Sequence, residues 1–264
     1  MRRLVTIIAA TAFLGAAALF AVLLARAGTE TFRITVVEGL TVDQTLDSLA
    51  SQTGFTVDEL AGPLLDGTVT SALLPGTPAT LRDWEGMLFP DTYDVTDRQT
   101  PAEILQRLAD TAEARVSSVD WSEAAARGLS VYEGIVVASM IEREAAVDDD
   151  RPLISSVIHN RLEIGMRLQI DATVVYAIGG YPEGGLTLDD LRVDSPYNTY
   201  RIDGLPPTPI SGVGLASLEA AAAPADTGYF FYVLASPDGS HAFAEDYDEF
   251  LVLVEQSRRA GLIP

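Results

Sequence analysis

The chain has 264 residues, of which 48% are hydrophobic and 21% charged, a composition typical of globular proteins. The absence of cysteine excludes disulfide frameworks and thiolate chemistry, and the presence of only two histidines, His159 and His241, disfavours a multi-histidine metal centre. A formal net charge of −21 disfavours nucleic-acid partners, and the absence of lysine excludes Schiff-base and Ser-Lys chemistry. We therefore expect an exclusively protein-based site without metal or cofactor.

The start of the chain predicts a membrane anchor. Arg2 and Arg3 precede an uninterrupted apolar run, Leu4–Ala25, which at about 1.5 Å per residue can cross about 30 Å of hydrocarbon. The arginines favour a cytoplasmic N-terminus, with the rest of the chain outside. A cleaved signal peptide is the alternative, because Ala25-Arg26-Ala27 resembles a small-x-small cleavage site. We expect a single-pass protein of the cytoplasmic (inner) membrane, anchored by residues 1–30.

The next segment predicts a small βα module that ends in a loop rich in proline and glycine, residues 75–78. Its expected elements are a strand over Phe32–Val37, a helix capped by Thr41 or Asp43 that ends near Ser51, and a second helix from Thr56.

The remaining residues predict more helix than strand, and the strongest helical pattern runs from Ser130 to Ala146. The other expected elements are helices over Pro101–Val116, Leu186–Leu191 (capped by Thr187), Leu215–Ala223 and Asp246–Ala260, an extended segment Met166–Ala177, a buried strand Tyr229–Leu234 and a short strand around His241–Phe243. The expected class is α+β, with a helix-rich main domain, a short mixed sheet, the βα front module and one N-terminal transmembrane helix.

The helix Ser130–Ala146 carries two carboxylates near its end, Glu142 and Glu144. Glu144 shares a helical face with the apolar residues three, four and seven positions before it, whereas Glu142 lies on another face. A carboxyl against an apolar wall has a raised pKa, as a general acid working near neutral pH requires. The alternative is a solvated Glu-Arg-Glu cluster, and periodicity leaves both readings open.

Several motifs follow one another in a consistent order. They are Trp84–Tyr93, Ala138–Ala145, Ser156–Leu162, Ile164–Gln169 with Asp171, Ser195–Tyr200, Gly204–Pro207, Gly214–Ala221 and the region Tyr229–His241. Together they resemble the MltG-type (YceG-like) endolytic murein transglycosylases, and the resemblance runs from about Val36 to the C-terminus. Ile170 and Ala172 depart from it, since the family usually has Thr and Pro there.

The resemblance implies that Glu144 is the catalytic acid and base, with Glu142 as the alternative. Such enzymes cut the β-1,4 bond between N-acetylmuramic acid and N-acetylglucosamine, and the C6 hydroxyl of the muramoyl sugar replaces water as the nucleophile. The product has a 1,6-anhydro end, and one carboxylate suffices because the nucleophile belongs to the substrate.

The residues expected to bind the sugar on this account are Gln169, Asp171, Tyr197, Asn198, Thr199, Asn160, Arg161 and His241. Structural alternatives stay open: Asp171 as a turn cap, Asn198 as a local brace of its loop, Asn160-Arg161 as a brace of a helix and His241 as a structural residue.

The resemblance further implies a small LysM-like or truncated front module over residues 31–80 and a YceG-like catalytic domain over 81–264. The implied partners are peptidoglycan glycan strands and peptidoglycan synthases, in a role that terminates glycan elongation. Two other functions stay open: a non-catalytic peptidoglycan-binding scaffold of the cell-wall synthesis complex, and a muramidase that uses water with a second carboxylate such as Asp171.

Overall fold

The computed structural model describes residues 30–263. The apolar run expected to form the anchor lies outside the described residues. Between residues 30 and 263, the helices lack the combination of length and apolar character that crossing a membrane requires.

The first part of the structure is built on an antiparallel pair of strands, with Ile34 opposite Tyr93 and both side chains buried. The helices beside this pair begin at threonine N-caps, because the threonine hydroxyl accepts a hydrogen bond from the first turn. Of the two caps expected for the first helix, Thr41 and Asp43, the structure has Thr41, and the second helix begins after Thr56 as expected. The elements are β1 (Thr31–Thr35), α2 (Val42–Thr53), α3 (Val57–Leu65), η1 (Leu81–Trp84), β2 (Thr92–Thr96) and α4 (Pro101–Ser118).

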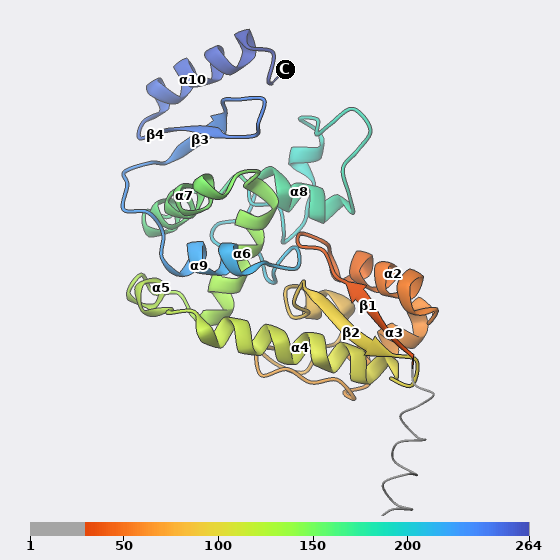
Figure 1. Ribbon diagram of the computed structural model, residues 1–264. Coiled ribbons are helices and arrows are strands. Elements are labelled where there is room, and N and C mark those ends of the chain that lie inside the picture. Colours follow the sequence, from red (N-terminus) through yellow and green to blue (C-terminus); the bar gives the residue numbers. More distant parts are fainter. Residues whose placement is uncertain (1–29, 264) are drawn as a thin grey trace, which may run out of the picture.

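The second part surrounds a central helix, α6 (Val131–Glu144), which contacts α5, α7, α8 and α9. Figure 1 shows β3, β4 and α10 at one end of the molecule and β1, β2 and α2 at the other, with α6 between them. The remaining elements are α5 (Ser122–Ala126), η2 (Asp148–Asp150), α7 (Arg151–Glu163), α8 (Asp171–Ile178), η3 (Asp190–Arg192), α9 (Leu215–Ala222), β3 (Phe231–Leu234), β4 (His241–Ala244) and α10 (Tyr247–Arg259).

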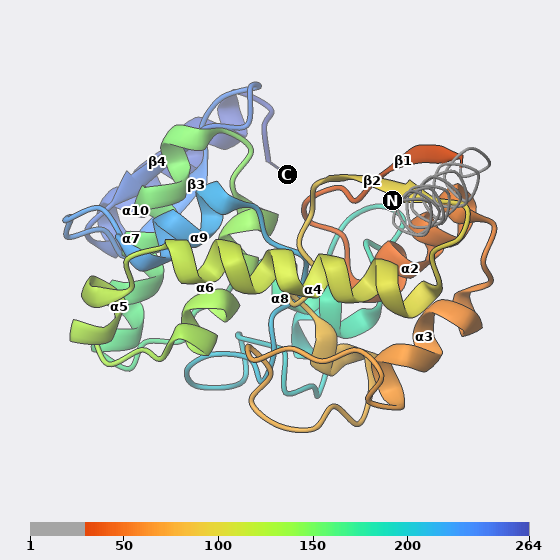
Figure 2. The same cartoon turned by 60° about the horizontal axis from the view of Figure 1, so that its bottom comes forward.

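A hydrophobic core that includes Ile34, Trp84, Leu108 and Ile141 joins the two parts. The long helix α4 runs along both of them, as Figure 2 shows. The sheet pairing also joins the two sides of residue 80, because β1 belongs to the expected front module and β2 lies beyond it. The overall class is helix-rich α+β, as predicted.

Four predictions about elements were wrong. Residues 171–178 form α8 rather than an extended segment, although Thr173, Val174 and Val175 favour strands, because α8 packs on α6 and closes with Gly179 in the left-handed conformation. The strand β3 is half-buried rather than buried. The expected helix Leu186–Leu191 is a turn followed by η3. In place of one mixed sheet, residues 30–263 hold two separate antiparallel pairs.

Candidate active site

Glu144 is the last residue of α6, and its half-buried carboxyl group is held at both oxygens. The backbone N–H of Ala172 donates to Oε1 at 3.4 Å, and the hydroxyl of Tyr232 donates to Oε2 at 3.1 Å. Burial is the main cause that raises the pKa of Glu144, and the nearby charge of Asp171 raises it further, while the two hydrogen bonds oppose the shift. The result is a carboxyl group that keeps its proton to higher pH than a solvated glutamate.

This carboxyl group lies in a cavity of about 360 Å³ whose walls come from α6, α7, the start of α8, the loop at Tyr200, β3 and α10. Its lining residues are Glu144, Arg161, Gln169, Asp171, Tyr200, Phe231, Tyr232, Tyr247 and Phe250. Aromatic rings beside polar groups form a surface that suits sugar rings with hydroxyl groups.

Asp171 and Gln169, both expected at the site, lie in this cavity at the start of α8. Asp171 Oδ1 accepts a hydrogen bond from the hydroxyl of Tyr200, and the pKa of this tyrosine is raised mainly by burial and further by this bond. Gln169 has a φ of 50°, a left-handed conformation that costs a non-glycine residue about 1 kcal/mol or more. Its backbone N–H donates to Thr199 O, which holds this strained residue at the cavity.

Arg161 lines the cavity from α7, and its guanidinium group donates hydrogen bonds to backbone carbonyl oxygens. Its Nε donates to Phe230 O at 2.7 Å and another guanidinium nitrogen donates to Leu168 O, while its guanidinium lies 5.4 Å from the ring centre of Phe231. Arg161 therefore ties α7 to β3 and to the segment before α8, which are two of the cavity walls.

Tyr232 is held from behind by a pair of residues that lie outside the cavity lining. His241 meets the ring of Tyr232 edge-on, with ring centres 5.3 Å apart. Asp150 Oδ2 accepts from the His241 backbone N–H at 2.8 Å and pairs with its Nδ1 at 2.9 Å. His241, expected to bind sugar, thus supports Tyr232 from the neighbouring strand.

Four other residues expected at the site lie outside the cavity lining and make structural contacts. Asn198 donates to Leu191 O and Val193 O and holds its own loop, while Thr199 is fully buried and bonds to Thr173. Tyr197 is buried and bonds to Thr208. Asn160 donates to the carbonyl oxygens of Thr227 and Tyr229 and so braces the chain before β3.

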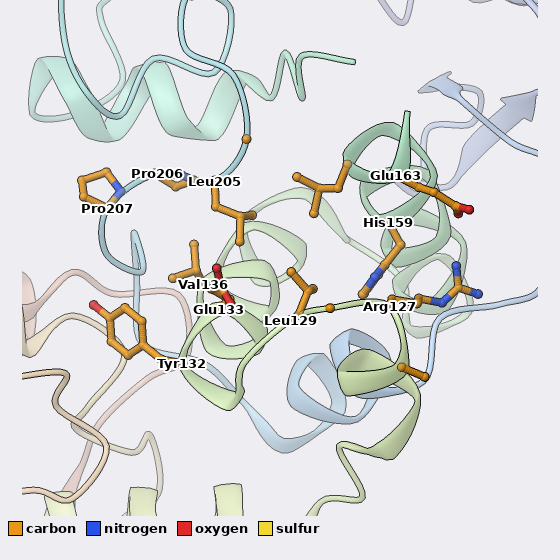
Figure 3. A pocket seen from close by; sticks show the side chains of 14 residues that line it. Arg127, Leu129, Tyr132, Glu133, Val136, His159, Glu163, Leu205, Pro206 and Pro207 are labelled. Atoms are coloured by element: carbon orange, nitrogen blue, oxygen red, sulfur yellow. The ribbon is translucent and has the colours of Figure 1, made fainter. Parts of the chain in front are cut away.

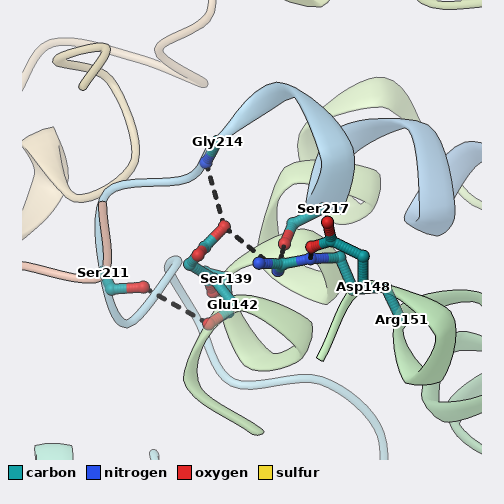
Figure 4. A network of polar contacts seen from close by, with 7 residues as sticks. All are labelled: Ser139, Glu142, Asp148, Arg151, Ser211, Gly214 and Ser217. Carbon is teal, nitrogen blue, oxygen red and sulfur yellow. Dashed lines mark hydrogen bonds and ion pairs between the residues drawn. The ribbon is translucent and has the colours of Figure 1, made fainter. Parts of the chain in front are cut away.

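Glu142 occupies different surroundings from Glu144. Its side chain is only 6% exposed, its Oε2 accepts from the Gly214 N–H at 3.0 Å, and it forms an ion pair with Arg151 at 3.5 Å. Figure 4 shows this network, in which Arg151 also bonds to Ser217 on α9. Glu142 therefore joins α6 to the start of α7 and to α9, and both of these contacts are structural.

Sequence reasoning missed Tyr232, Asp150 and the α10 residues that close the cavity. The partners of Glu144 lie far along the chain, 28 residues away for Ala172 and 88 for Tyr232, so helical periodicity could not indicate them. Tyr232 carried one usable signal, because it lies in the dense aromatic run before His241.

A larger cavity of about 960 Å³ lies on another side of α6, between α5, α7 and residues 204–207 (Figure 3). Its acidic groups include Glu133, whose carboxylate already caps α6 through Ser130. His159 in its wall pairs with Ala221 O through Nε2. Within residues 30–263, no group of three or more His, Cys, Asp or Glu side chains is placed to hold a metal ion.

Comparison with known proteins identifies the family to which the chain belongs. The model of the YceG-like family matches residues 14–256. The chain is 36% identical to the endolytic murein transglycosylase of Bacillus subtilis over 229 residues, covering 83% of this chain and 63% of the relative. It is 27% identical to the Streptococcus pneumoniae enzyme of the same name over 238 residues, covering 81% of this chain and 43% of that one.

A solved structure is also similar. The crystal structure of a YceG-like protein from Listeria monocytogenes superposes with a TM-score of 0.72 at 32% identity, covering 84% of this chain and 75% of that one. The chain spans less than two thirds of the length of the curated relatives it matches. The family match covers most of the chain, and the protein therefore belongs to the YceG-like family.

Proposed function

We propose that the protein is an endolytic lytic transglycosylase of peptidoglycan and that Glu144 is its catalytic acid and base. The observation that carries the proposal is the Glu144 carboxyl group itself, which has a raised pKa and a wall of aromatic and polar side chains. The relatives named endolytic murein transglycosylases supply the substrate class and the reaction.

In the proposed reaction, protonated Glu144 first donates its proton to the glycosidic oxygen between N-acetylmuramic acid and N-acetylglucosamine. The bond from C1 of the muramoyl sugar to that oxygen breaks. The resulting carboxylate then takes the proton of the C6 hydroxyl while the C6 oxygen bonds to C1. The 1,6-anhydro product forms without water, and Glu144 ends in its starting protonation state.

The neighbours of Glu144 support both halves of this cycle. Burial favours the protonated form needed for the first step, while the donors Tyr232 and Ala172 stabilise the carboxylate needed for the second. Asp171 adds negative charge beside the positive charge that develops on the sugar ring in the transition state. Gln169 and Tyr200 are proposed to contact the sugar from the same cavity.

A water-using muramidase is the second candidate, and one observation favours it: Asp171 is a second carboxylate in the cavity of Glu144. In hydrolases such a group activates water or attacks the sugar. The two reactions differ in the chain end they leave, which is anhydro for the transglycosylase and reducing for the muramidase.

Membrane anchoring by residues 1–30, the division into a front module (31–80) and a catalytic domain (81–264), and association with peptidoglycan synthases complete the proposal. Their support is the apolar run after Arg2-Arg3 and the family membership. They support a position on the outer side of the cytoplasmic membrane, where nascent glycan strands are made.

The test is cleavage of polymeric glycan by the full chain, with product ends identified by mass spectrometry. The proposal requires anhydro ends from the parent protein, no cleavage by Glu144→Gln and parent-like cleavage by Glu163→Gln. Glu163 is the control because it is exposed and lines the cavity of about 960 Å³ on another side of α6, so that the same chemical change is made away from Glu144. Cleavage by a folded Glu144→Gln protein at the parental rate would refute the assignment.

A further inference from the structure

A second cavity, of about 400 Å³, lies beside Glu144 between α2 and α8. Ala172 belongs to its lining, and the N–H of the same residue donates to Glu144 Oε1. Tyr181 also lines it and lies near enough to Glu144 and Asp171 for both charges to add to the rise in its pKa, which comes mainly from burial. The second cavity therefore adjoins the Glu144 carboxyl group.

Two arginines line this second cavity, and each retains unused donors. The guanidinium of Arg82 lies 5.5 Å from the ring centre of Tyr176, and Arg143 donates to Gly39 O at 2.9 Å. Both side chains belong to exposed residues, and among the described residues neither is paired with a carboxylate. Two such guanidinium groups at one cavity stand out in a chain with a net charge of −21.

The acids of the lining do not neutralise these arginines at pH 7. Glu85 is 2% exposed and accepts from the Val42 N–H at 2.9 Å and from the Tyr176 hydroxyl at 3.0 Å. Burial raises its pKa to about 8, so it is mostly uncharged at pH 7. The remaining acid is Asp43, and the cavity therefore carries a net positive charge.

We infer that this cavity binds the carboxylates of an acidic peptide branch carried by the glycan, with Arg82 and Arg143 as the residues that pair with them. The inference rests on the proposed function, because peptidoglycan carries such peptides on the lactyl group of N-acetylmuramic acid. A neutral sugar offers guanidinium groups only uncharged acceptors, whereas a carboxylate matches both their charge and their fork of donors. The cavity thus recognises the peptide while the site at Glu144 recognises the sugar.

The test measures binding to the full-length Glu144→Gln protein, so that cleavage plays no part. Three labelled glycan preparations are compared: one with acidic peptides, one with the peptide carboxylates converted to amides, and one with the peptides removed by an amidase. The last preparation keeps a free lactyl carboxylate on each muramic acid. Amidation should weaken binding at least fivefold, the effect of losing about 1 kcal/mol from a charge pair.

Arginine variants connect this loss to the cavity. Arg82→Gln and Arg143→Gln should each weaken binding of the acidic preparation severalfold and leave binding of the amidated one unchanged. The control, Arg33→Gln, makes the same charge change at a side chain that is 76% exposed and paired only with exposed Asp94. It should bind all three preparations as the unsubstituted Glu144→Gln protein does.

Three results would overturn the inference. The first is equal affinity of the Glu144→Gln protein for the acidic and amidated preparations, a result that can be obtained without the arginine variants. The second is an equal loss for both preparations in the arginine variants, which would indicate a purely structural role. The third is arginine-dependent binding of the peptide-free preparation alone, which would make the lactyl carboxylate the ligand. A parent protein that cleaves no glycan contradicts the proposed function instead, since cleavage does not enter these comparisons.

Discussion

The hydroxyl of Tyr232 on β3 donates a hydrogen bond of 3.1 Å to Oε2 of Glu144 at the end of α6. Burial and the adjacent Glu144 charge raise the pKa of Tyr232 well above 10, so the tyrosine keeps its proton and remains a donor at neutral pH. The bond is therefore present for the carboxylate form of Glu144 and lowers the pKa of this group against the effect of burial.

Tyr232→Phe should reduce kcat about 10- to 100-fold, because a hydrogen bond to a charged group contributes about 1.5–3 kcal/mol. Loss of the donor raises the pKa of Glu144 further, so the limb of the pH–rate profile that requires protonated Glu144 should move to higher pH. Steady-state rates from pH 4 to 9 measure both effects. Tyr247→Phe is the control, since Tyr247 lines the same cavity and contacts Phe231 and Phe250 through its ring.

The two glutamates of α6 should respond differently to the same substitution. Glu144→Gln should abolish cleavage and leave the melting temperature nearly unchanged. Glu142→Gln should weaken the contact with Arg151 and destabilise the fold by about 1–3 kcal/mol, with cleavage retained where the protein is folded. Denaturant unfolding and cleavage assays on both variants check this, and the reverse pattern would assign catalysis to Glu142.

Glu85 should make the stability of the protein depend on pH. Its pKa rises from 4.5 to about 8 on folding, so the native state holds this proton more tightly than the unfolded state. The stabilisation is complete below pH 4.5 and is lost as pH rises toward 8, at up to about 1.4 kcal/mol per pH unit. Glu85→Gln imitates the protonated form and should gain stability over the parent between pH 5 and pH 8. If the free energy of unfolding depends on pH in the same way in both proteins, the raised pKa of Glu85 is contradicted.

Gly134 tests the packing of α6. A Cβ atom at this position would overlap the ring of Trp121, so Gly134→Ala should destabilise the protein by about 1–3 kcal/mol even though alanine favours helices. Gly62→Ala in α3 is the matched control, because nothing lies within 4 Å of its added Cβ. That variant should be neutral or gain up to about 1 kcal/mol, and urea unfolding measures both.

Local signals in the sequence predicted where several of the helices begin. Thr41, Thr56 and Ser130 each cap a helix where the sequence placed its start, since a cap and its partners lie within four residues. The helical period likewise predicted that Glu142 and Glu144 lie on different faces of the helix. In the structure Glu144 lines the cavity, whereas Glu142 contacts Gly214 and Arg151. The α8 helix was missed because its β-branched residues favour a strand locally and its packing on α6 overrides them.

The surroundings of Glu144 could be predicted only in part. Gln169 and Asp171 reach the cavity, whereas Asn198 and Thr199 hold the adjacent loop. A sequence motif does not distinguish residues whose side chains line the cavity from residues whose hydrogen bonds hold the adjacent loop in shape. The bond between Asp150 and His241 spans 91 positions, so only the folded chain reveals that His241 supports Tyr232.

The most direct test of the central claim is cleavage of polymeric glycan in water enriched in oxygen-18, followed by mass spectrometry of the new ends. An intramolecular attack by the C6 hydroxyl takes up no solvent oxygen. We therefore expect 1,6-anhydro ends without the heavy isotope, formed by the parent protein and not by Glu144→Gln. Reducing ends that carry oxygen-18 would contradict it and identify a muramidase.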